Sequence, residues 1–114
     1  MEFEIAAHHL SVYTITIAGR LDANATPRLK EVLRTMTRDG STNFVVDLRD
    51  VTFIDSTGLG VLTSLLRAAR AADGTVRLVL HPDSALHNII SIVRFDHMFD
   101  LYETPDQALS DFRF

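Results

Sequence analysis

Residues 45–70 read VVDLRDVTFIDSTGLGVLTSLLRAAR, and the change of pattern within this stretch decides the fold. A nearly continuous apolar run leads into Asp55, Ser56 and Thr57, and an apolar period of three to four residues follows Gly58. The first pattern is typical of a strand covered on both faces, and the second is typical of an amphipathic helix. The stretch therefore predicts a buried strand that runs directly into a helix, with a serine at the junction.

Upstream of this stretch, the sequence predicts a hairpin followed by a helix. Residues 11–19 alternate between apolar and polar side chains, as a strand does, and residues 3–7 read as a weaker strand. Residues 8–11 are then the hairpin turn. In the helix that follows, Thr26 is the predicted N-cap before a proline, and Gly40 is the predicted stop.

Downstream, the chain returns to a strand and then to two more helices. Residues 75–80 read as a strand, and residues 83–94 read as a helix. The predicted buried side of that helix consists of Leu86, Ile89, Ile90 and Val93. A short strand near residues 98–103 and a last helix from residue 105 complete the pattern.

Length and composition limit both fold and function. With 114 residues the chain is predicted to be a single α/β domain over residues 1–114, with a mixed, mostly parallel sheet, an N-terminal β-hairpin and about four packed helices. Eleven basic and fifteen acidic residues give a formal charge of -4, which argues against nucleic acid as a partner. No apolar run approaches the roughly 18 residues of a spanning helix, so we expect a cytoplasmic protein without membrane insertion.

The residue types also disfavour a metal or cofactor. Cysteine is absent, so disulfides, thiolate metal sites and thiol catalysis are excluded. The pair His8 and His9 falls in the predicted hairpin turn, where polar side chains are ordinary, and the other histidines are scattered without a ligand spacing. We therefore expect neither a metal nor a cofactor.

Ser56 lies at the predicted carboxyl end of an interior strand, where ligands and reactions gather in open α/β sheets. A nucleophile elbow requires G-x-S-x-G, but Ile54 occupies the place of the first glycine. A phosphate-binding G-x-x-x-x-G-K-[ST] loop is absent, and no lysine follows a late strand to assist a phosphoacceptor aspartate. We expect no catalytic residue and no enzyme activity. Two readings remain: Asp55 or Ser56 caps the helix, or Ser56 is modified by another protein.

Gly58 and Gly60 are unusual at the start of a helix, because each costs about 1 kcal/mol relative to alanine. A cap does not explain them. Their presence in the first turn predicts a close approach by another stretch of backbone or by a partner.

The segment VVDLRDVTFIDSTGLGVL, residues 45–62, resembles the signature of the STAS domain, and specifically that of bacterial anti-sigma-factor antagonists. The resemblance extends over residues 19–33 and 73–109, and its D-S-[ST]-G-L core is highly specific between a strand and a helix. In that family the serine after the aspartate is phosphorylated, which implies Ser56 here. Thr57 stands where many members carry a second serine, and it is the less favoured acceptor.

The resemblance implies an antagonist that binds an anti-sigma factor with serine kinase activity and thereby releases its sigma factor. Phosphorylation of Ser56 switches the antagonist off, and a serine phosphatase acting on phosphorylated Ser56 restores it. The partner-binding residues implied are Asp22, Asn24, Asp55, Ser56, Thr57 and Gly58. For Asp22 and Asn24, a role in the turn before the helix has an equal claim. The alternative function is a cytosolic STAS subunit of a membrane lipid-transport complex.

Overall fold

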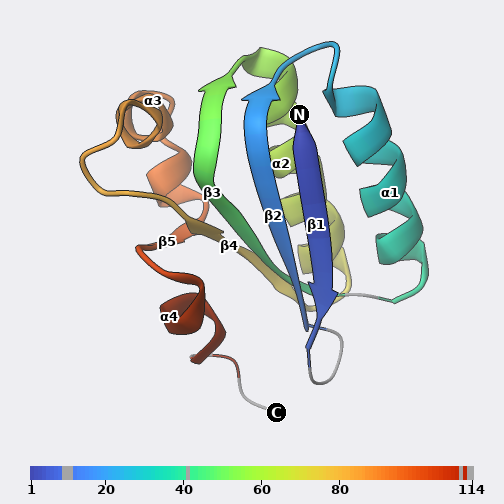
Figure 1. Cartoon of the computed structure of the whole chain (residues 1–114). Coiled ribbons are helices and arrows are strands. Elements are labelled where there is room, and N and C mark those ends of the chain that lie inside the picture. Colours follow the sequence, from blue (N-terminus) through green and yellow to red (C-terminus); the bar gives the residue numbers. More distant parts are fainter. Residues whose placement is uncertain (9–11, 41, 111, 113–114) are drawn as a thin grey trace.

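A computed structural model describes residues 1–8, 12–40, 42–110 and 112, and it contains one five-stranded sheet in the order β1-β2-β3-β4-β5 (Figure 1). The strands are β1 Glu2–Ala7, β2 Val12–Leu21, β3 Asn43–Ile54, β4 Thr75–Val79 and β5 Asp100–Tyr102. The helices are α1 Thr26–Arg38, α2 Ser56–Ala71, α3 Ala85–Ile92, the short 3-10 helix η1 Phe95–His97 and α4 Pro105–Ser110. Strand β1 is antiparallel to β2, and all other neighbours are parallel. The predicted mixed α/β sheet with four helices is confirmed.

The N-terminal hairpin is confirmed by the antiparallel pairing of β1 with β2. Its predicted turn falls on residues 8–11, of which 9–11 lie outside the described residues. In the part of the chain that the structure covers, no helix combines the length and apolar content needed to cross a membrane.

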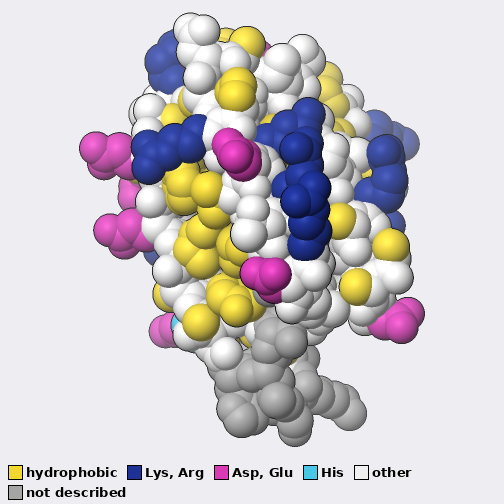
Figure 2. All heavy atoms as spheres, turned by 90° about the vertical axis from the view of Figure 1, so that its right-hand side faces the viewer, with side chains coloured by type: hydrophobic (Ala, Val, Ile, Leu, Met, Phe, Trp, Pro, Cys, Tyr) yellow, Lys and Arg dark blue, Asp and Glu magenta, His cyan; other side chains and the backbone are white. Residues whose placement is uncertain are grey.

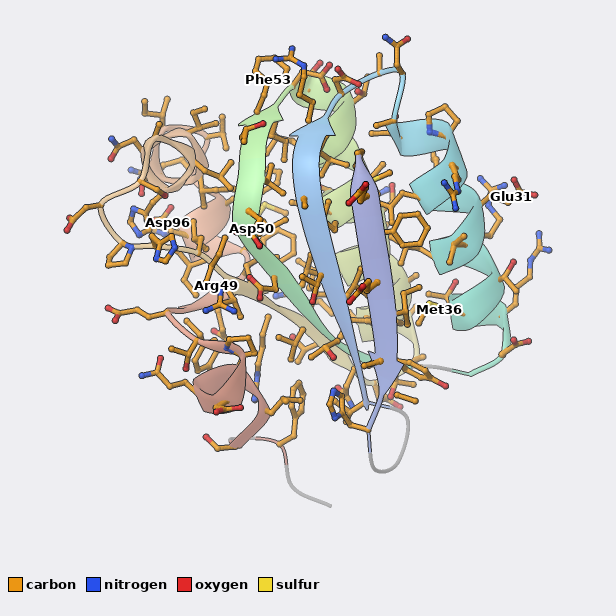
Figure 3. The ribbon with its side chains drawn as sticks, viewed as in Figure 1. Glu31, Met36, Arg49, Asp50, Phe53 and Asp96 are labelled. Carbon is orange, nitrogen blue, oxygen red and sulfur yellow. The ribbon has the colours of Figure 1, made fainter. Side chains whose placement is uncertain are left out.

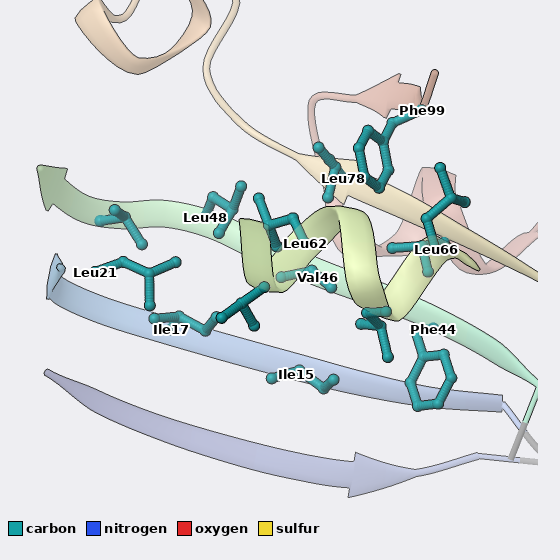
Figure 4. Close-up of a cluster of buried hydrophobic side chains, with 14 of the residues drawn as sticks. Ile15, Ile17, Leu21, Phe44, Val46, Leu48, Leu62, Leu66, Leu78 and Phe99 are labelled. Carbon is teal, nitrogen blue, oxygen red and sulfur yellow. The ribbon is translucent and has the colours of Figure 1, made fainter. Parts of the chain in front are cut away.

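The main core lies between the sheet and α2 (Figure 4), and side chains of α1 and α3 belong to the same cluster. Strand β3 explains the continuous apolar run, because side chains on both of its faces are buried from Phe44 to Leu48. Phe44 and Val46 belong to the main core, whereas Val45 packs with Ala108 of α4 in a smaller second cluster. Burial on both faces fixes β3 at the centre of the sheet and so fixes where its carboxyl end lies.

The predicted start of α1 is wrong by one residue. Thr26 is the first helical residue rather than the N-cap, and Ala25 at the cap position makes no side-chain hydrogen bond. The carboxylate of Asp22 instead accepts from the backbone N–H groups of Asn24 and Ala25, at 3.1 and 3.2 Å. The predicted stop is confirmed, because Gly40 follows the helix with a φ of +88° that favours glycine.

The predicted buried side of α3 is only half correct. Leu86 and Ile90 are buried, but Ile89 and Val93 are 37% and 40% exposed. The helix is short and packs against β3 beyond the point where β4 stops pairing with it, at Asp47. A narrow contact of this kind covers one row of side chains and leaves the next row in solvent. Val93 also lies after the helix, at its C-cap.

Candidate functional site

The candidate site lies where β2 and β3 end side by side and α2 begins, at the upper edge of the sheet in Figure 1. The last residues of the two strands, Leu21 and Ile54, are paired in register. The backbone N–H of Asp55 donates to the carbonyl of Leu21 at 3.4 Å. The start of α2 is therefore attached to the end of β2 and to the loop that follows it.

Asp55 is the N-cap of α2 and also joins two segments of the site. Its Oδ1 accepts from the backbone N–H groups of Thr57 and Gly58, both at 3.0 Å, and from the hydroxyl of Thr57. Its Oδ2 accepts from the backbone N–H of Ala23 at 3.1 Å. Of the two residues that the sequence offered as the cap, Asp55 performs that role, and it also holds the loop between β2 and α1 in place.

These hydrogen bonds set the charge of Asp55. The bond from the Thr57 hydroxyl, followed by that from the Gly58 amide, lowers the pKa of the carboxyl group below its ordinary value. An ordinary aspartate is already ionised at neutral pH, and the lowered pKa keeps Asp55 ionised to a more acidic pH. A negative charge at this end of a helix is stabilising, because the unpaired N–H groups of the first turn carry partial positive charge.

The lowered pKa of Asp55 gives a pH-dependent prediction. A group whose pKa is lower in the folded state stabilises the fold above its unfolded pKa, near 4, and that contribution is lost as pH falls through the folded value. Asp55→Ala should therefore lower the thermal midpoint at pH 7, and its difference from wild type should shrink toward pH 3. Thermal unfolding across this range measures both, with Asp83→Ala as an exposed-carboxylate control. An equal difference at both pH values would contradict the role assigned to Asp55.

Ser56 is the first residue of α2 and its side chain is exposed. Among the described residues none forms a hydrogen bond with its hydroxyl, whereas the Thr57 hydroxyl donates to Asp55. Within the described residues, the Ser56 oxygen is therefore not hydrogen-bonded to a side chain that could act as its base. It is open to an external enzyme, and the electropositive start of a helix can accommodate a group with negative charge.

The two glycines of the motif have different roles. Gly58 is buried, and a Cβ atom there would lie 2.4 Å from the carbonyl oxygen of Leu21 and 2.8 Å from Cγ1 of Ile54. At Gly60 a Cβ atom would have no neighbour within 4 Å. The predicted close approach is therefore confirmed for Gly58, whereas at Gly60 no other described segment of this chain comes close and approach by a partner stays a prediction. The approaching backbone is this chain's own β2, so Gly58 has a packing role, and its predicted contact with a partner stays a prediction.

Asp22 and Asn24 lie in the loop that Asp55 holds. The Asp22 carboxylate and its own carbonyl both accept hydrogen bonds from the next residues of the loop, so Asp22 builds the turn. Asn24 is exposed and its backbone N–H donates to Asp22. The fold thus brings Asp22 and Asn24 to the same edge as Ser56, because Ala23 between them is bonded to Asp55.

Two further residues at this edge, Arg20 and Phe53, were missed from the sequence. The Arg20 guanidinium lies 4.1 Å from the centre of the Phe53 ring, and its Nε donates to Asp22 Oδ2 at 3.4 Å. Phe53 is 39% exposed although it directly precedes Ile54, the last residue of the apolar run. The available signal was its position next to Ile54, since neighbouring strand residues point to opposite faces and Ile54 is buried.

Comparisons with known proteins are consistent across sequence and structure. A family model described as "Mlab, STAS domain" matches residues 6–103. An anti-sigma-B factor antagonist of Staphylococcus aureus is 39% identical over 61 residues, which are 54% of this chain and 56% of that protein. The match thus spans little more than half the length of that relative.

Solved structures match over nearly the whole chain. An anti-sigma factor antagonist from Mycobacterium paratuberculosis aligns with a TM-score of 0.83 at 26% identity, covering 96% of this chain and 91% of that one. The Bacillus cell fate determinant SpoIIAA in its phosphorylated form aligns with a TM-score of 0.79 at 19% identity, covering 98% and 100%. At 19% identity, the match to the Bacillus protein shows a shared fold only.

Proposed function

The chain belongs to the STAS domain family, and from this premise we propose that it is an anti-sigma-factor antagonist controlled by phosphorylation of Ser56. The observation that carries the proposal is the exposed Ser56 hydroxyl, which has no hydrogen-bond partner among the described residues and lies at the start of α2. The relatives named as antagonists support the choice of partner class. The proposed partner is an anti-sigma factor that is also a serine kinase.

In the proposed mechanism, the unphosphorylated protein binds the anti-sigma factor through the edge formed by Ser56, Thr57 and the Asp22–Asn24 loop. Binding releases the sigma factor, and the kinase then transfers the γ-phosphoryl group of ATP to the Ser56 oxygen, with ADP as the leaving group and loss of the hydroxyl proton. A serine phosphatase removes the phosphate and restores binding. In this cycle the protein is a substrate and a competitor, and it has no catalytic role. We place it in the cytoplasm with the transcription machinery.

Phosphate acts in this proposal through charge rather than through refolding. It adds about -1.5 to -2 units of charge, and it would stand beside the ionised Asp55 at the electropositive end of α2. The shared fold with the phosphorylated Bacillus protein supports a scaffold that tolerates the modification. A docked partner surface meets the added charge directly.

The first test is the site of phosphorylation. With a purified anti-sigma factor kinase and labelled ATP, wild type should incorporate phosphate, Ser56→Ala should lose nearly all of it, and Thr57→Ala should retain it. The reason is that the Ser56 hydroxyl is unbonded, whereas that of Thr57 is bonded to Asp55. Peptide mass spectrometry locates the phosphate. Incorporation that persists in Ser56→Ala would refute the proposal.

The same protein used as bait separates the two candidate functions. If it functions as an antagonist, affinity capture without ATP should yield a kinase, and later addition of ATP should release that kinase and leave phosphate on Ser56. If it is a cytosolic STAS subunit of a lipid-transport complex, capture should yield a transporter ATPase and leave Ser56 unmodified. The phosphorylation state of the Ser56 peptide, measured by mass spectrometry, therefore distinguishes the two functions.

A further inference from the structure

Four large hydrophobic side chains are exposed in the described part of the chain: three belong to α3 or its C-cap, and the fourth lines the same hollow as one of these three. They are Phe53, Ile89, Ile92 and Val93, which we call the α3 patch. Ile92 is 78% exposed and lies three residues after Ile89 in α3. Val93 follows at the C-cap, where its backbone N–H donates to the carbonyl of Ile89 at 3.1 Å. Exposed apolar side chains that cluster in this way mark contact surfaces more often than isolated ones do.

Phe53 and Ile89 connect the strand end to the helix. Both line a hollow of about 160 Å³ between the last part of β3 and the start of α3. Apolar side chains of Leu48, Val51 and Leu86 also line it, and polar residues, among them Arg49 and His81, lie at its wall. The hollow has room for one apolar side chain of another molecule, which is the arrangement that interface anchors use.

The α3 patch is continuous with the edge that carries Ser56. Phe53 lies at the end of β3, two residues before Asp55 (Figure 3). The Arg20 guanidinium covers part of the Phe53 ring and is bonded to Asp22 in the neighbouring loop. A partner seated over Ser56 therefore has the polar loop on one side and the apolar patch on the other.

The size of a specific interface favours contact with both parts. Such interfaces cover about 800 Å² on each partner, which is a substantial share of the 6392 Å² that this chain exposes. The polar edge consists of a short loop and the first turn of one helix, so a partner at Ser56 extends over its neighbours. We propose that the anti-sigma factor kinase also contacts the α3 patch and inserts an apolar side chain into the hollow between Phe53 and Ile89.

This inference rests on the proposed function, and it assigns binding affinity and the phosphorylation switch to two different surfaces. The α3 patch supplies affinity that is independent of phosphate, whereas Ser56 carries the switch. A contact remote from the reacting hydroxyl stabilises the ground state and the transition state equally. Its loss raises KM and leaves kcat unchanged.

The test is steady-state phosphorylation of Ser56 by the purified kinase that modifies wild type. Ile92→Ser should raise KM about tenfold and leave kcat within about twofold, because its side chain is remote from the hydroxyl. Thermal unfolding should show no loss of stability, since Ile92 is mostly in solvent. Arg67→Ser, an exposed change on α2 outside the patch, is the matched control and should leave KM unchanged.

Two outcomes would overturn the inference. An unchanged KM for Ile92→Ser would remove the α3 patch from the kinase interface. If sedimentation showed in addition that wild type is a dimer and Ile92→Ser a monomer, the patch would serve self-association instead. Absence of Ser56 phosphorylation in wild type would refute the proposed function and this inference together. Normal phosphorylation with an unchanged KM for Ile92→Ser would refute this inference alone.

Seen from the side of α1, basic side chains form a column on the helical face (Figure 2). A separate apolar area lies beside this column, toward the sheet. Lys30 and Arg34 line a groove of about 220 Å³ between α1 and α2 on the helical face. This face lies away from α3, so Lys30→Ser provides a second control. It should also leave the KM for Ser56 phosphorylation unchanged.

Discussion

Ser56→Asp is expected to weaken binding of the anti-sigma factor by about a hundredfold or more while leaving the fold intact. A charge placed against an interface without a partner costs several kcal/mol, and each 1.4 kcal/mol is about tenfold in affinity. The side chain is exposed at the start of α2, and a carboxylate at that position is favoured locally by about 0.3–1 kcal/mol. Affinity and stability should therefore respond differently to one substitution.

Calorimetric titration and thermal unfolding measure the two responses. Ser56→Asn is the control of matched shape without charge, and it should bind within about tenfold of wild type. Ser56→Ala should also bind and should keep its thermal midpoint, because Asp55 rather than Ser56 caps the helix. Equal affinities for the aspartate and asparagine variants would contradict an electrostatic switch. Unfolding of the aspartate variant would instead make Ser56 a structural residue.

Gly58→Ala and Gly60→Ala form the second prediction, and they should change stability in opposite directions. Alanine at Gly58 places a Cβ atom against the backbone of Leu21, a collision that costs about 3 kcal/mol and is offset by about 1 kcal/mol of helix propensity. Alanine at Gly60 meets nothing and should gain about 0.5–1 kcal/mol. The two variants should therefore differ by about 3 kcal/mol, or roughly 10 °C in thermal midpoint.

Chemical denaturation of the two variants and wild type gives the free energies directly. Each glycine is the control for the other, since both changes add the same methyl group within the first helical turns. If both variants were stabilised, β2 would not be in close contact with the start of α2. If both were destabilised, Gly60 would have a neighbour that the structure does not show.

The junction between β3 and α2 could be predicted because several local signals coincide there. The buried run before Ile54, the capping aspartate and the helical period after Gly58 all depend on near neighbours in the chain. The cap of α1 could not be predicted in the same way. Thr26 has the preferred residue type, but it is already helical, and Asp22, four residues earlier, binds the N–H groups of the turn before the helix rather than those of its first turn.

Other features could not be predicted because they depend on contacts between distant segments. Gly58 and Gly60 are the same letter two residues apart, and only the position of β2 distinguishes them. Ile89 and Val93 match the apolar period of α3, but the helix packs beyond the end of β4 and covers only one row. Phe53 and Arg20 belong to different strands, so their contact at the site had no signal within either segment.

The bond between Asp55 and Ala23 bears on how fast the proposed switch can operate. Because one carboxylate fixes both the helix start and the facing loop, the edge is assembled before any partner arrives. Association then requires no prior rearrangement of this chain, and rates on the order of 10⁵–10⁷ M⁻¹ s⁻¹ are typical of such docking. A cell that used this protein would set its response time by the abundance of the kinase and phosphatase, and not by a slow motion within the antagonist.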